Sequence, residues 1–374
     1  MRNLKIGLVG FGFMGKTHLH SVRELPFFYN AEQAGFTAEV LAVCASTEER
    51  ARAAAEAFGI PRAYPDAAAM IADPDIDVID ICTPNPLHFE VARDAILAGK
   101  HVLCEKPLTL TAAEAETLCS LADKHGVVCG MVFNNRFLSP IMRARALIDE
   151  GRLGRILSFE FTYRHNSCID PSRRVGWKQQ ADFGGGTLAD LGPHVIDLCR
   201  HLCGELISVT GRGQIAYPSH LTADGSSWQT DADEAFYILG STRDGAVGSI
   251  TVSKLTQGAN DDLTFRVFGE RGSVAFSLMQ PNYLAFYDAT AKAGESGYTQ
   301  LECVGRYPAP ATGFPTVKAP QGWLRGHIGC MASYLSAVAA GVTPEASFAD
   351  GLYVQRVMEA ARESDRDGRE VRLC

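Results

Sequence analysis

The sequence predicts an α/β protein in which a doubly wound parallel sheet precedes a mostly antiparallel sheet. Short β-type apolar runs alternate with helical segments through residue 133, as in successive β–α units. After residue 154, β-type runs follow one another across Gly, Asn and Asp turns, with few helices between them. A chain of 374 residues exceeds one compact core, so we expect two domains, at residues 1–133 and 134–374.

The composition describes a well-packed, mildly acidic protein. Hydrophobic residues make up 46% of the chain and charged residues 21%, and the formal net charge is -8. Such a charge does not attract nucleic acid or an anionic membrane, and no uninterrupted apolar segment is long enough to span a bilayer. The 11 cysteines include no Cys-x-x-Cys pair, so neither a disulfide framework nor a zinc knuckle is indicated. We therefore expect a cytoplasmic protein.

A glycine-rich turn joins the first apolar run to the first helical segment. Gly10-Phe-Gly12-Phe-Met-Gly15 follows the strand directly. In a dinucleotide-binding fingerprint, Gly10 makes the tight turn, Gly12 admits the pyrophosphate, and Gly15 lets the helix pack closely on the strand. The first domain is therefore expected to be a Rossmann domain that binds NAD(P). Two further residues of the turn are expected beside the cofactor, Phe13 and Met14.

The end of the second strand bears on the choice of cofactor. An NAD-preferring site usually ends this strand, here residues 40–44, with an acidic residue that holds the ribose 2′-hydroxyl, but Ala45 offers no carboxylate. A 2′-phosphate is therefore not repelled, and Ser46, Thr47 and Arg50 could donate hydrogen bonds to it. The loop favours NADP over NAD, although Ser46 and Thr47 would serve equally well as the cap of the next helix.

Two more loops follow predicted strands at the carboxyl edge of the sheet, where ligands of parallel sheets bind. Residues 83–88 contain two prolines and an asparagine and form a rigid loop after the strand at 76–82. Lys106 follows the strand at 101–104 and precedes a proline, so an extended or cis turn can direct its ammonium group into the cleft. Cofactor contacts are expected from both loops, at Thr83, Pro84, Asn85, His88, Glu105 and Lys106.

A helix in the second half carries a polar stripe beside its apolar one. Apolar residues recur at helical spacing within residues 184–201. Asp190 and His194 lie four residues apart, so a carboxylate and an imidazole point the same way. Because Pro193 fits only a first turn, the regular helix is expected to begin near Leu191, with Asp190 at its edge. An ordinary amphipathic helix with a solvated face is the alternative.

Together these motifs resemble those of the Gfo/Idh/MocA family, the relatives of glucose–fructose oxidoreductase and inositol dehydrogenase. The resemblance is carried, in order along the chain, by Gly10-x-Gly-x-x-Gly15, Cys82-Thr-Pro-Asn-Pro-Leu-His88, Glu105-Lys-Pro107, Gly184-Gly-Gly-x-Leu-x-Asp-x-Gly-x-His194-x-x-Asp197 and Ser347-Phe-Ala-Asp-Gly-Leu. It implies a Rossmann domain, a C-terminal domain with an open sheet used for dimer or tetramer contacts, and catalytic roles for Lys106, Asp190 and His194. We also expect the last helix, 349–364, to pack back on the first domain.

The chemistry of alcohol oxidation fits the same residues. His194 can take the hydroxyl proton as hydride leaves the same carbon, and Lys106 can stabilise negative charge on the carbinol oxygen. Asp190 can bind a neighbouring hydroxyl or tune His194, and Asp197 can orient the imidazole. A polyhydroxylated ligand needs further polar and aromatic contacts, for which the candidates are Asn135, Tyr163, Arg164, His165 and Trp177. Ordinary packing or surface positions explain these five equally well.

The sequence thus predicts an NAD(P)-dependent oxidoreductase that acts without a metal on a secondary hydroxyl or ketone of a sugar, sugar acid or cyclitol. A homodimer or homotetramer formed through the C-terminal sheet is expected. Three alternatives remain open. A zinc polyol dehydrogenase could use Asp190, His194 and Asp197 as ligands, but no cysteine–histidine–glutamate set joins them. A redox-assisted glycoside-cleaving enzyme would retain its cofactor. A non-catalytic sensor of sugar and NAD(P) would not need Lys106, Asp190 and His194 together.

Overall fold

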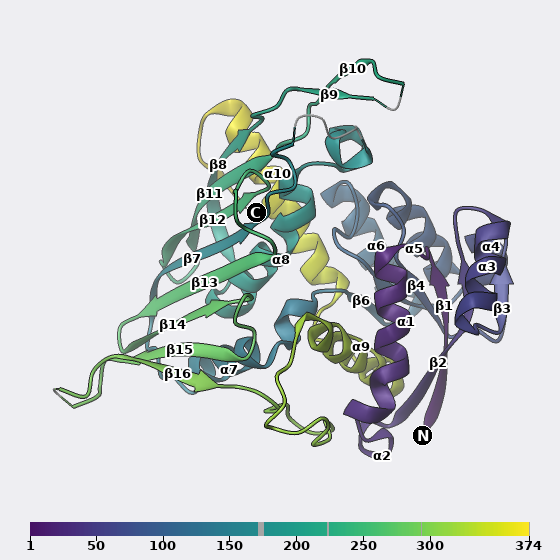
Figure 1. Ribbon diagram of the computed structural model, residues 1–374, viewed down its shortest axis with the longest axis horizontal. Coiled ribbons are helices and arrows are strands. Elements are labelled where there is room, and N and C mark those ends of the chain that lie inside the picture. Colours follow the sequence, from purple (N-terminus) through teal and green to yellow (C-terminus); the bar gives the residue numbers. More distant parts are fainter. Residues whose placement is uncertain (171–175, 223, 293, 374) are drawn as a thin grey trace. The chain divides into compact units, whose positions relative to one another are not determined.

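The chain forms two compact units (Figure 1). The computed structural model describes residues 1–170, 176–222, 224–292 and 294–373. The first unit comprises Met1–Phe137 and Gly305–Tyr353, and the second comprises Leu138–Val304 and Val354–Cys374. The structure thus divides the chain differently from the expected 1–133 and 134–374, because a late segment returns to the first unit.

The first unit contains a doubly wound parallel sheet, as predicted. Its order is β3-β2-β1-β4-β5-β6, and all neighbouring strands pair in parallel. The strands are β1 (Arg2–Val9), β2 (Phe36–Cys44), β3 (Arg62–Tyr64), β4 (Val78–Ile81), β5 (His101–Cys104) and β6 (Cys129–Met131). The strand order reverses at β1, so the carboxyl ends of β1 and β4 flank the switch point where ligands of such sheets bind.

Helices pack along this sheet. They are α1 (Phe13–Phe28), α2 (Ala31–Ala34), α3 (Glu48–Phe58), α4 (Ala67–Ile71), α5 (His88–Leu97), α6 (Ala112–His125) and α9 (Trp323–Ala340), with short 3-10 turns η1 (Asn85–Leu87) and η2 (Asn134–Phe137). The late helix α9 packs against α1, β1 and β2, and its Ile328 and Leu335 lie in one buried cluster with Leu8 and Leu19. Burial of this apolar helix holds the returning segment to the first unit.

The last helix, α10 (Phe348–Asp367), crosses the division between the units. Its residues through Tyr353 are grouped with the first unit and the rest with the second. A Cβ on Gly351 would lie 2.9 Å from the Met131 sulfur and 3.0 Å from Leu108, so the first turn of α10 packs tightly on the first unit. The helix that packs on this unit along its length is therefore α9.

The second unit is built on a nine-stranded, mostly antiparallel sheet, again as predicted. Its order is β16-β15-β14-β13-β7-β12-β11-β8-β17. The strands are β7 (Ile156–Arg164), β8 (Leu206–Gln214), β11 (Ala235–Thr242), β12 (Val247–Ser253), β13 (Asp262–Gly269), β14 (Gly272–Ser277), β15 (Tyr283–Asp288), β16 (Tyr298–Glu302) and β17 (Val371–Arg372), with a separate ribbon of β9 (Ser219–Leu221) and β10 (Ser227–Gln229). Within the described sheet, β7 and β12 pair in parallel and the other neighbours are antiparallel.

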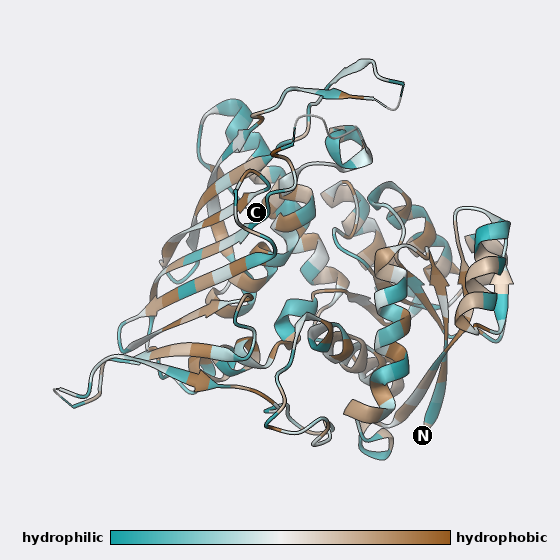
Figure 2. Ribbon diagram, in the orientation of Figure 1, coloured by the Kyte–Doolittle hydropathy of each residue, from teal (hydrophilic) through white to brown (hydrophobic). Residues whose placement is uncertain are grey.

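Helices cover one face of this sheet. Helix α8 (Thr187–Cys203) packs against β7, β11, β12 and β13, and α7 (Ser139–Asp149) packs against β14 and β15; two 3-10 turns, η3 (Trp177–Gln179) and η4 (Ala181–Phe183), precede α8. Hydrophobic and hydrophilic residues alternate along the strands (Figure 2), so Phe159 and Phe161 are buried while Glu160 is exposed. Among the helices described, none combines the length and the apolar character that a membrane span requires.

The start of α8 differs from the prediction. The helix begins at Thr187 rather than near Leu191, and Pro193 lies inside it. Proline removes one backbone donor, and its ring also crowds the Cβ of the residue before it. That preceding residue is Gly192, which has no Cβ, so the second penalty is absent. Asp190 consequently sits within the first helical turn.

Candidate functional site

The glycine turn after β1 leaves an open space at the start of α1. Gly10 has a φ of +97°, and a Cβ there would lie 2.6 Å from the carbonyl oxygen of Cys82. A Cβ on Gly15 would lie 2.2 Å from the Gly10 carbonyl oxygen, whereas one on Gly12 would meet nothing within 4 Å. The unpaired N–H groups of the first turn of α1 therefore border a space that a pyrophosphate can enter. The glycines occupy the positions that the fingerprint requires.

The other two residues of this turn, Phe13 and Met14, form the start of α1. The Phe13 side chain is 73% exposed, and its ring stacks on Trp323 with a centroid separation of 5.9 Å. An exposed aromatic pair thus stands beside the open space.

The loop after β2 lacks an acidic side chain at Ala45, as read from the sequence. Thr47 Oγ1 accepts a hydrogen bond from the backbone N–H of Arg50 at 3.2 Å, so Thr47 caps α3. The Arg50 guanidinium donates to Ser46 Oγ at 3.0 Å, and both side chains are exposed. The helix-cap interpretation is therefore right for Thr47, while Ser46 and Arg50 present a hydroxyl and a cation at the end of β2.

His88 ties two predicted cofactor loops together. Its ring is fully buried, with Nδ1 2.8 Å from the Pro107 carbonyl oxygen and Nε2 2.9 Å from that of Thr83. Burial lowers the pKa of His88, although both carbonyls favour the protonated ring. Because its ring nitrogens face the chain itself, His88 can affect a cofactor only through these loops. The neighbouring Pro84 and Asn85 form the start of η1.

Glu105 and Lys106 follow β5 directly. The Lys106–Pro107 peptide bond is cis, one of the two conformations expected. Lys106 is half-buried, and its backbone N–H donates to Oε2 of Glu105 at 3.1 Å. The Glu105 side chain is buried beneath the loop, so its carboxylate faces the protein interior and not the cofactor space.

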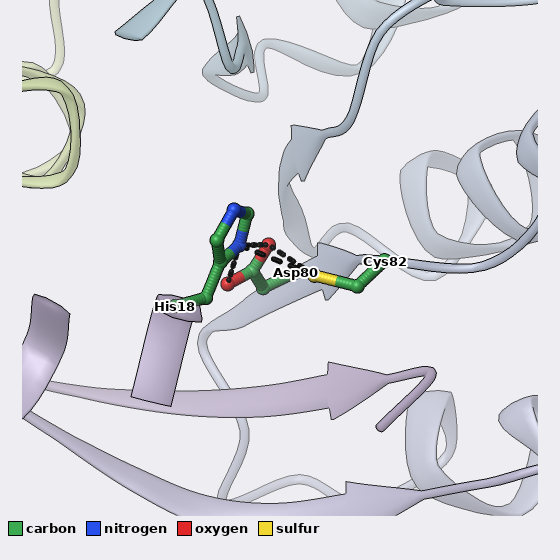
Figure 3. Close-up of side chains that lie close together, drawn as sticks. All are labelled: His18, Asp80 and Cys82. Atoms are coloured by element: carbon green, nitrogen blue, oxygen red, sulfur yellow. Dashed lines mark hydrogen bonds and ion pairs between the residues drawn. The ribbon is translucent and has the colours of Figure 1, made fainter. Parts of the chain in front are cut away.

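A buried histidine that we did not predict connects this loop to the sheet. His18, in the second turn of α1, has Nδ1 at 2.9 and 3.0 Å from the two carboxylate oxygens of Asp80 (Figure 3). Its Nε2 lies 3.2 Å from Oε1 of Glu105, and the Cys82 sulfur lies 3.2 Å from Nδ1. The available signal was Asp80, a carboxylate inside the apolar strand β4, because a buried charge needs a partner.

Electrostatics favour charged forms of this group. Burial alone would lower the pKa of His18, but the charge and hydrogen bond of Asp80, together with the contact to Cys82, outweigh it and raise that pKa well above its usual value. Burial opposes ionisation of Glu105, yet the hydrogen bond and charge of His18 lower the Glu105 pKa to about 2. Burial and the Asp80 charge raise the pKa of the Cys82 thiol to about 12. The group is therefore two carboxylates around one cationic ring, beside a neutral thiol.

His18, Asp80 and Cys82 are also the three described residues whose donor atoms lie close enough together to hold a metal ion. The separations of 2.9 Å between His18 Nδ1 and Asp80 and 3.2 Å between Nδ1 and Cys82 are hydrogen-bond distances. A metal would also require the Cys82 thiolate, which the raised pKa opposes. We therefore interpret the group as one that holds a proton.

In the second unit, strand pairing gathers polar residues at one edge of the sheet. The parallel pair β7–β12 places the carboxyl ends of both strands there, with Arg164 opposite Ser253, and β13 begins at the same edge, with Asp262 opposite Arg164. The edge therefore collects the polar residues at these strand ends, which are Tyr163, His165, Lys254 and Asp261.

The first turn of α8 brings Asp190 to two ammonium groups. Its Oδ2 lies 2.7 Å from Lys254 Nζ and 2.9 Å from Lys178 Nζ. The Lys254 side chain is 7% exposed and that of Lys178 is 44% exposed. Neither lysine was predicted. For Lys254, the available signal was its position directly after strand β12. The turn itself is fixed by Asp233, whose Oδ2 accepts from the backbone N–H of Leu188 at 2.7 Å.

His194 lies one turn further along α8 and is half-buried. Its ring packs edge-to-face on Tyr163 with a centroid separation of 5.8 Å. The Tyr163 hydroxyl donates to Oδ1 of Asp261 at 2.5 Å, and His165 Nε2 lies 3.1 Å from the same oxygen. Burial raises the pKa of Tyr163 well above its usual value. Burial also opposes ionisation of Asp261, but hydrogen bonds from His165 and Tyr163 lower its pKa. The site thus offers donors and a stable anion beside the imidazole.

Arg164 is the predicted substrate residue that the structure removes from this site. Successive residues of a strand point to opposite faces, and Tyr163 faces α8, so Arg164 faces away from it. Its side chain lines a cavity of about 480 Å³ on the far face of the sheet, together with Glu160 and Arg266. A contact between Arg164 and a substrate bound beside His194 is therefore not supported.

The remaining predicted residues stay candidates. Asn135 lies in η2 of the first unit and is buried. Trp177 lies in η3 and is half-buried, with the Lys178 ammonium group 5.5 Å from its ring centroid. Asp197 is buried on α8, three residues beyond His194. Lys106 belongs to the first unit, and Asp190 and His194 belong to the second.

Comparison with known proteins matches both units to one family. Residues 4–133 match the family described as an oxidoreductase family with an NAD-binding Rossmann fold, and residues 141–275 match the GFO/IDH/MocA C-terminal domain. Levoglucosan dehydrogenase from Pseudarthrobacter phenanthrenivorans is 32% identical over 97% of this chain and 96% of that protein. The NADP(+)-dependent scyllo-inositol 2-dehydrogenase of Bacillus subtilis is 31% identical over 55% of this chain and 54% of its own length.

Solved structures give the same result. A levoglucosan dehydrogenase in complex with NADH and L-sorbose superposes with a TM-score of 0.95 at 32% identity, covering 100% of both chains. The fold of both units is thus that of a sugar-dehydrogenase structure solved with a nicotinamide cofactor.

Proposed function

We propose that this chain, which belongs to the Gfo/Idh/MocA family of oxidoreductases, transfers hydride between NAD(P) and a secondary hydroxyl or ketone of a sugar, sugar acid or cyclitol. The relatives' names include a levoglucosan and a scyllo-inositol dehydrogenase, so the substrate class extends from anhydrosugars to cyclitols. The observation that carries the proposal is the polar edge around Asp190 and His194, where ammonium, carboxylate, phenol and imidazole groups meet as hydroxyl-binding partners.

The residue roles follow from chemistry. His194 takes the proton of the reacting hydroxyl, since a half-buried imidazole can exchange a proton in both directions near neutral pH. Lys106 stabilises negative charge on the carbinol oxygen. Asp190 binds a neighbouring hydroxyl, because its carboxylate is held in place by two ammonium groups. Bound NAD(P)+ supplies the hydride acceptor.

The first unit supports NAD(P) binding through its own residues. The open space at Gly12 and the start of α1 would hold the pyrophosphate, and Ser46 with Arg50 would hold the ribose end of the adenosine. Because this end has a cation and no carboxylate, we infer that NADP is accepted at least as well as NAD. Titration of tryptophan fluorescence with NADPH and NADH tests this inference, and a clear preference for NADH would contradict it.

The reaction is tested by following NAD(P)H absorbance with levoglucosan, scyllo-inositol, a pentose and an aldonic acid as substrates. We expect turnover with at least one member of this panel. His194→Ala should lower its kcat by about two to four orders of magnitude and leave NAD(P)H affinity nearly unchanged, because general base catalysis contributes about that much. His201→Ala, on the same helix, is the matched control. Unchanged turnover in His194→Ala would remove His194 from the mechanism.

The same purified protein distinguishes the competing functions. Cofactor that survives extensive dialysis, with cleavage of a glycoside and no net redox change, would indicate redox-assisted hydrolysis. Tight binding of cofactor and sugar without any turnover would indicate a sensor. Stoichiometric zinc would indicate a polyol dehydrogenase of the metal-dependent kind.

We also infer that copies of the chain associate through the face of the nine-stranded sheet opposite α8. Apolar side chains are exposed along its strands, among them Tyr237, Leu239 and Tyr283. Exposed apolar side chains on one face of a sheet are typical of interaction surfaces. Light scattering should give the mass of a dimer or a tetramer, and Leu239→Lys should reduce it. A monomeric wild-type protein would contradict the inference.

A further inference from the structure

The geometry around His18 identifies its protonation state. Both ring nitrogens face carboxylate oxygens, Nδ1 that of Asp80 at 2.9 Å and Nε2 that of Glu105 at 3.2 Å. An ionised carboxylate only accepts hydrogen bonds, so each ring nitrogen must carry a hydrogen to make its contact. A neutral imidazole has one N–H and would leave a lone pair facing the second carboxylate. The arrangement is therefore that of an imidazolium, and its ring is 1% exposed.

Glu105 bridges His18 and the backbone of Lys106. One of its oxygens, Oε1, faces His18, and the other, Oε2, accepts the backbone N–H of Lys106 at 3.1 Å. The backbone of Glu105 is itself held, because its N–H donates to the Ile81 carbonyl oxygen at 3.0 Å. A chain of hydrogen bonds thus runs from Asp80 in β4 through a ring on α1 to the residue that carries the reactive ammonium group.

We propose that His18 is a permanently protonated positioning residue that sets the orientation of Lys106 by clamping Glu105 against Asp80. The inference rests on the proposed role of Lys106 in catalysis. His18 touches neither substrate nor reacting atoms; it fixes the loop from which Lys106 acts. Small displacements of a catalytic group are costly, since a misplacement of about 1 Å can reduce turnover about a hundredfold.

The groups that surround the ring are compatible with a fixed positive charge. Those that face it from every packed element are Asp80, Cys82, Glu105, His327 and Cys330. Burial raises the pKa of both the Cys82 and the Cys330 thiols to about 12, so neither thiol contributes a negative charge near neutral pH. The Asp80 and Glu105 carboxylates, which face the two ring nitrogens, are therefore the groups positioned to stabilise a positive charge on His18. His327 lies on α9, with a ring centroid 6.1 Å from that of His18.

The charge on His18 can be measured without any substrate. In protein labelled with 15N-histidine, the His18 ring should keep imidazolium nitrogen shifts at pH values where a free imidazole has lost its proton. His20, exposed on the same helix, is the internal control. The signals are assigned with His18→Asn and His20→Asn. A His18 ring that titrates together with His20 would overturn the proposal, whatever reaction the enzyme catalyses.

The link to Lys106 is tested by Glu105→Gln. A glutamine keeps the volume but replaces one of the two accepting oxygens with an NH2 donor, which would face either the His18 ring N–H or the Lys106 N–H. We expect kcat to fall between about ten- and a hundredfold with unchanged NAD(P)H affinity. The kcat of His18→Asn should fall by a similar factor, whereas the kcat of His20→Asn should match that of the wild type. A loss confined to KM or to cofactor affinity would contradict positioning of Lys106.

The double variant separates positioning from general damage. If His18 acts through Glu105, adding His18→Asn to Glu105→Gln should lower kcat by a much smaller factor than the same substitution does in the wild type. Independent, multiplicative losses would show that His18 affects the enzyme by another route. Should His18→Asn fail to fold, Asp80→Asn serves instead, because it removes the second carboxylate and keeps an acceptor for Nδ1. Zinc that binds stoichiometrically and is lost in Cys82→Ser would make the group a metal site and overturn the proposal.

Discussion

Each unit holds one charged side chain between two groups of opposite sign, and the two arrangements are electrostatic opposites. In the first unit the cation His18 lies between two carboxylates, and in the second unit the anion Asp190 lies between two ammonium groups. The first arrangement carries a net negative charge and the second a net positive one. They also differ in exposure, since the His18 and Asp80 side chains are at most 2% exposed, whereas those of Asp190 and Lys178 are 18% and 44% exposed.

That difference in exposure separates a structural role from direct contact with a ligand. A sealed charge pair cannot meet a ligand, and its desolvation is compensated only by its own partners, so it can act only through the backbone that it holds. A charge pair open on one side can exchange water for substrate hydroxyls. The comparison therefore predicts that changes at Asp190 act on substrate chemistry, while changes at His18 act on the loop of Lys106.

Of the two charged arrangements, the larger effect on turnover is expected where the open one loses its central charge. Asp190→Asn leaves two ammonium groups without their shared carboxylate and removes a charged acceptor for a substrate hydroxyl. We expect kcat/KM to fall about a hundredfold or more, with NAD(P)H affinity unchanged. Steady-state kinetics with the best substrate measure this fall in kcat/KM. The control is Asp182→Asn, because Asp182 is an exposed aspartate in η4, shortly before α8. A loss of less than about threefold would place the substrate elsewhere.

A smaller effect separates the two lysines that bind Asp190. Lys254 is nearly sealed and Lys178 is exposed, and an exposed ion pair contributes only about 0–1 kcal/mol. Lys254→Met should therefore lower kcat/KM about tenfold, and Lys178→Met should lower it less than about threefold. Equal effects of the two substitutions would mean that exposure does not distinguish these contacts.

Features built from residues close together in the sequence could be predicted, whereas contacts between distant residues could not. The glycine turn, the Glu105–Lys106 pair and the Asp190–His194 spacing are local patterns, and the structure has each in the conformation or on the element expected. Pro193 misled the prediction of the start of α8, because the tolerance of a proline depends on Gly192 before it. The late return of α9 to the first unit has no local signature.

The partners that complete both charged arrangements come from distant segments. His18 and Asp80 are separated by 62 positions, and they meet because β4, which carries Asp80, pairs with β1, the strand that precedes α1. Lys254 joins Asp190 because α8 packs on β12. A buried charge in an apolar strand indicates that a partner exists, but periodicity does not identify it. The face that Arg164 occupies likewise follows only once the register of β7 is known.

The smallest expected effect is a difference in how stability depends on pH. The pKa of His18 is raised in the folded state, so its contribution to the free energy of unfolding is complete below about pH 6.5 and is lost as the pH rises toward the folded pKa. The Glu105 pKa is lowered to about 2, so its contribution is complete above about pH 4.5 and is lost as the pH falls toward 2. Asp261 in the second unit, whose pKa is also lowered, contributes in the same direction as Glu105.

The sealed arrangement should therefore add a loss of stability on the alkaline side that His18→Asn lacks. Between pH 7 and pH 9, the free energy of unfolding measured with urea should fall more steeply for the wild type than for His18→Asn, by up to about 1.4 kcal/mol per pH unit, which corresponds to one additional proton released on unfolding. The loss of stability at acid pH should persist in both proteins, because the His18→Asn substitution leaves Asp261 and its partners unchanged. Parallel alkaline slopes would mean that His18 binds no additional proton in the folded state, and the contrast between a sealed cation and an open anion would then reduce to a difference in exposure alone.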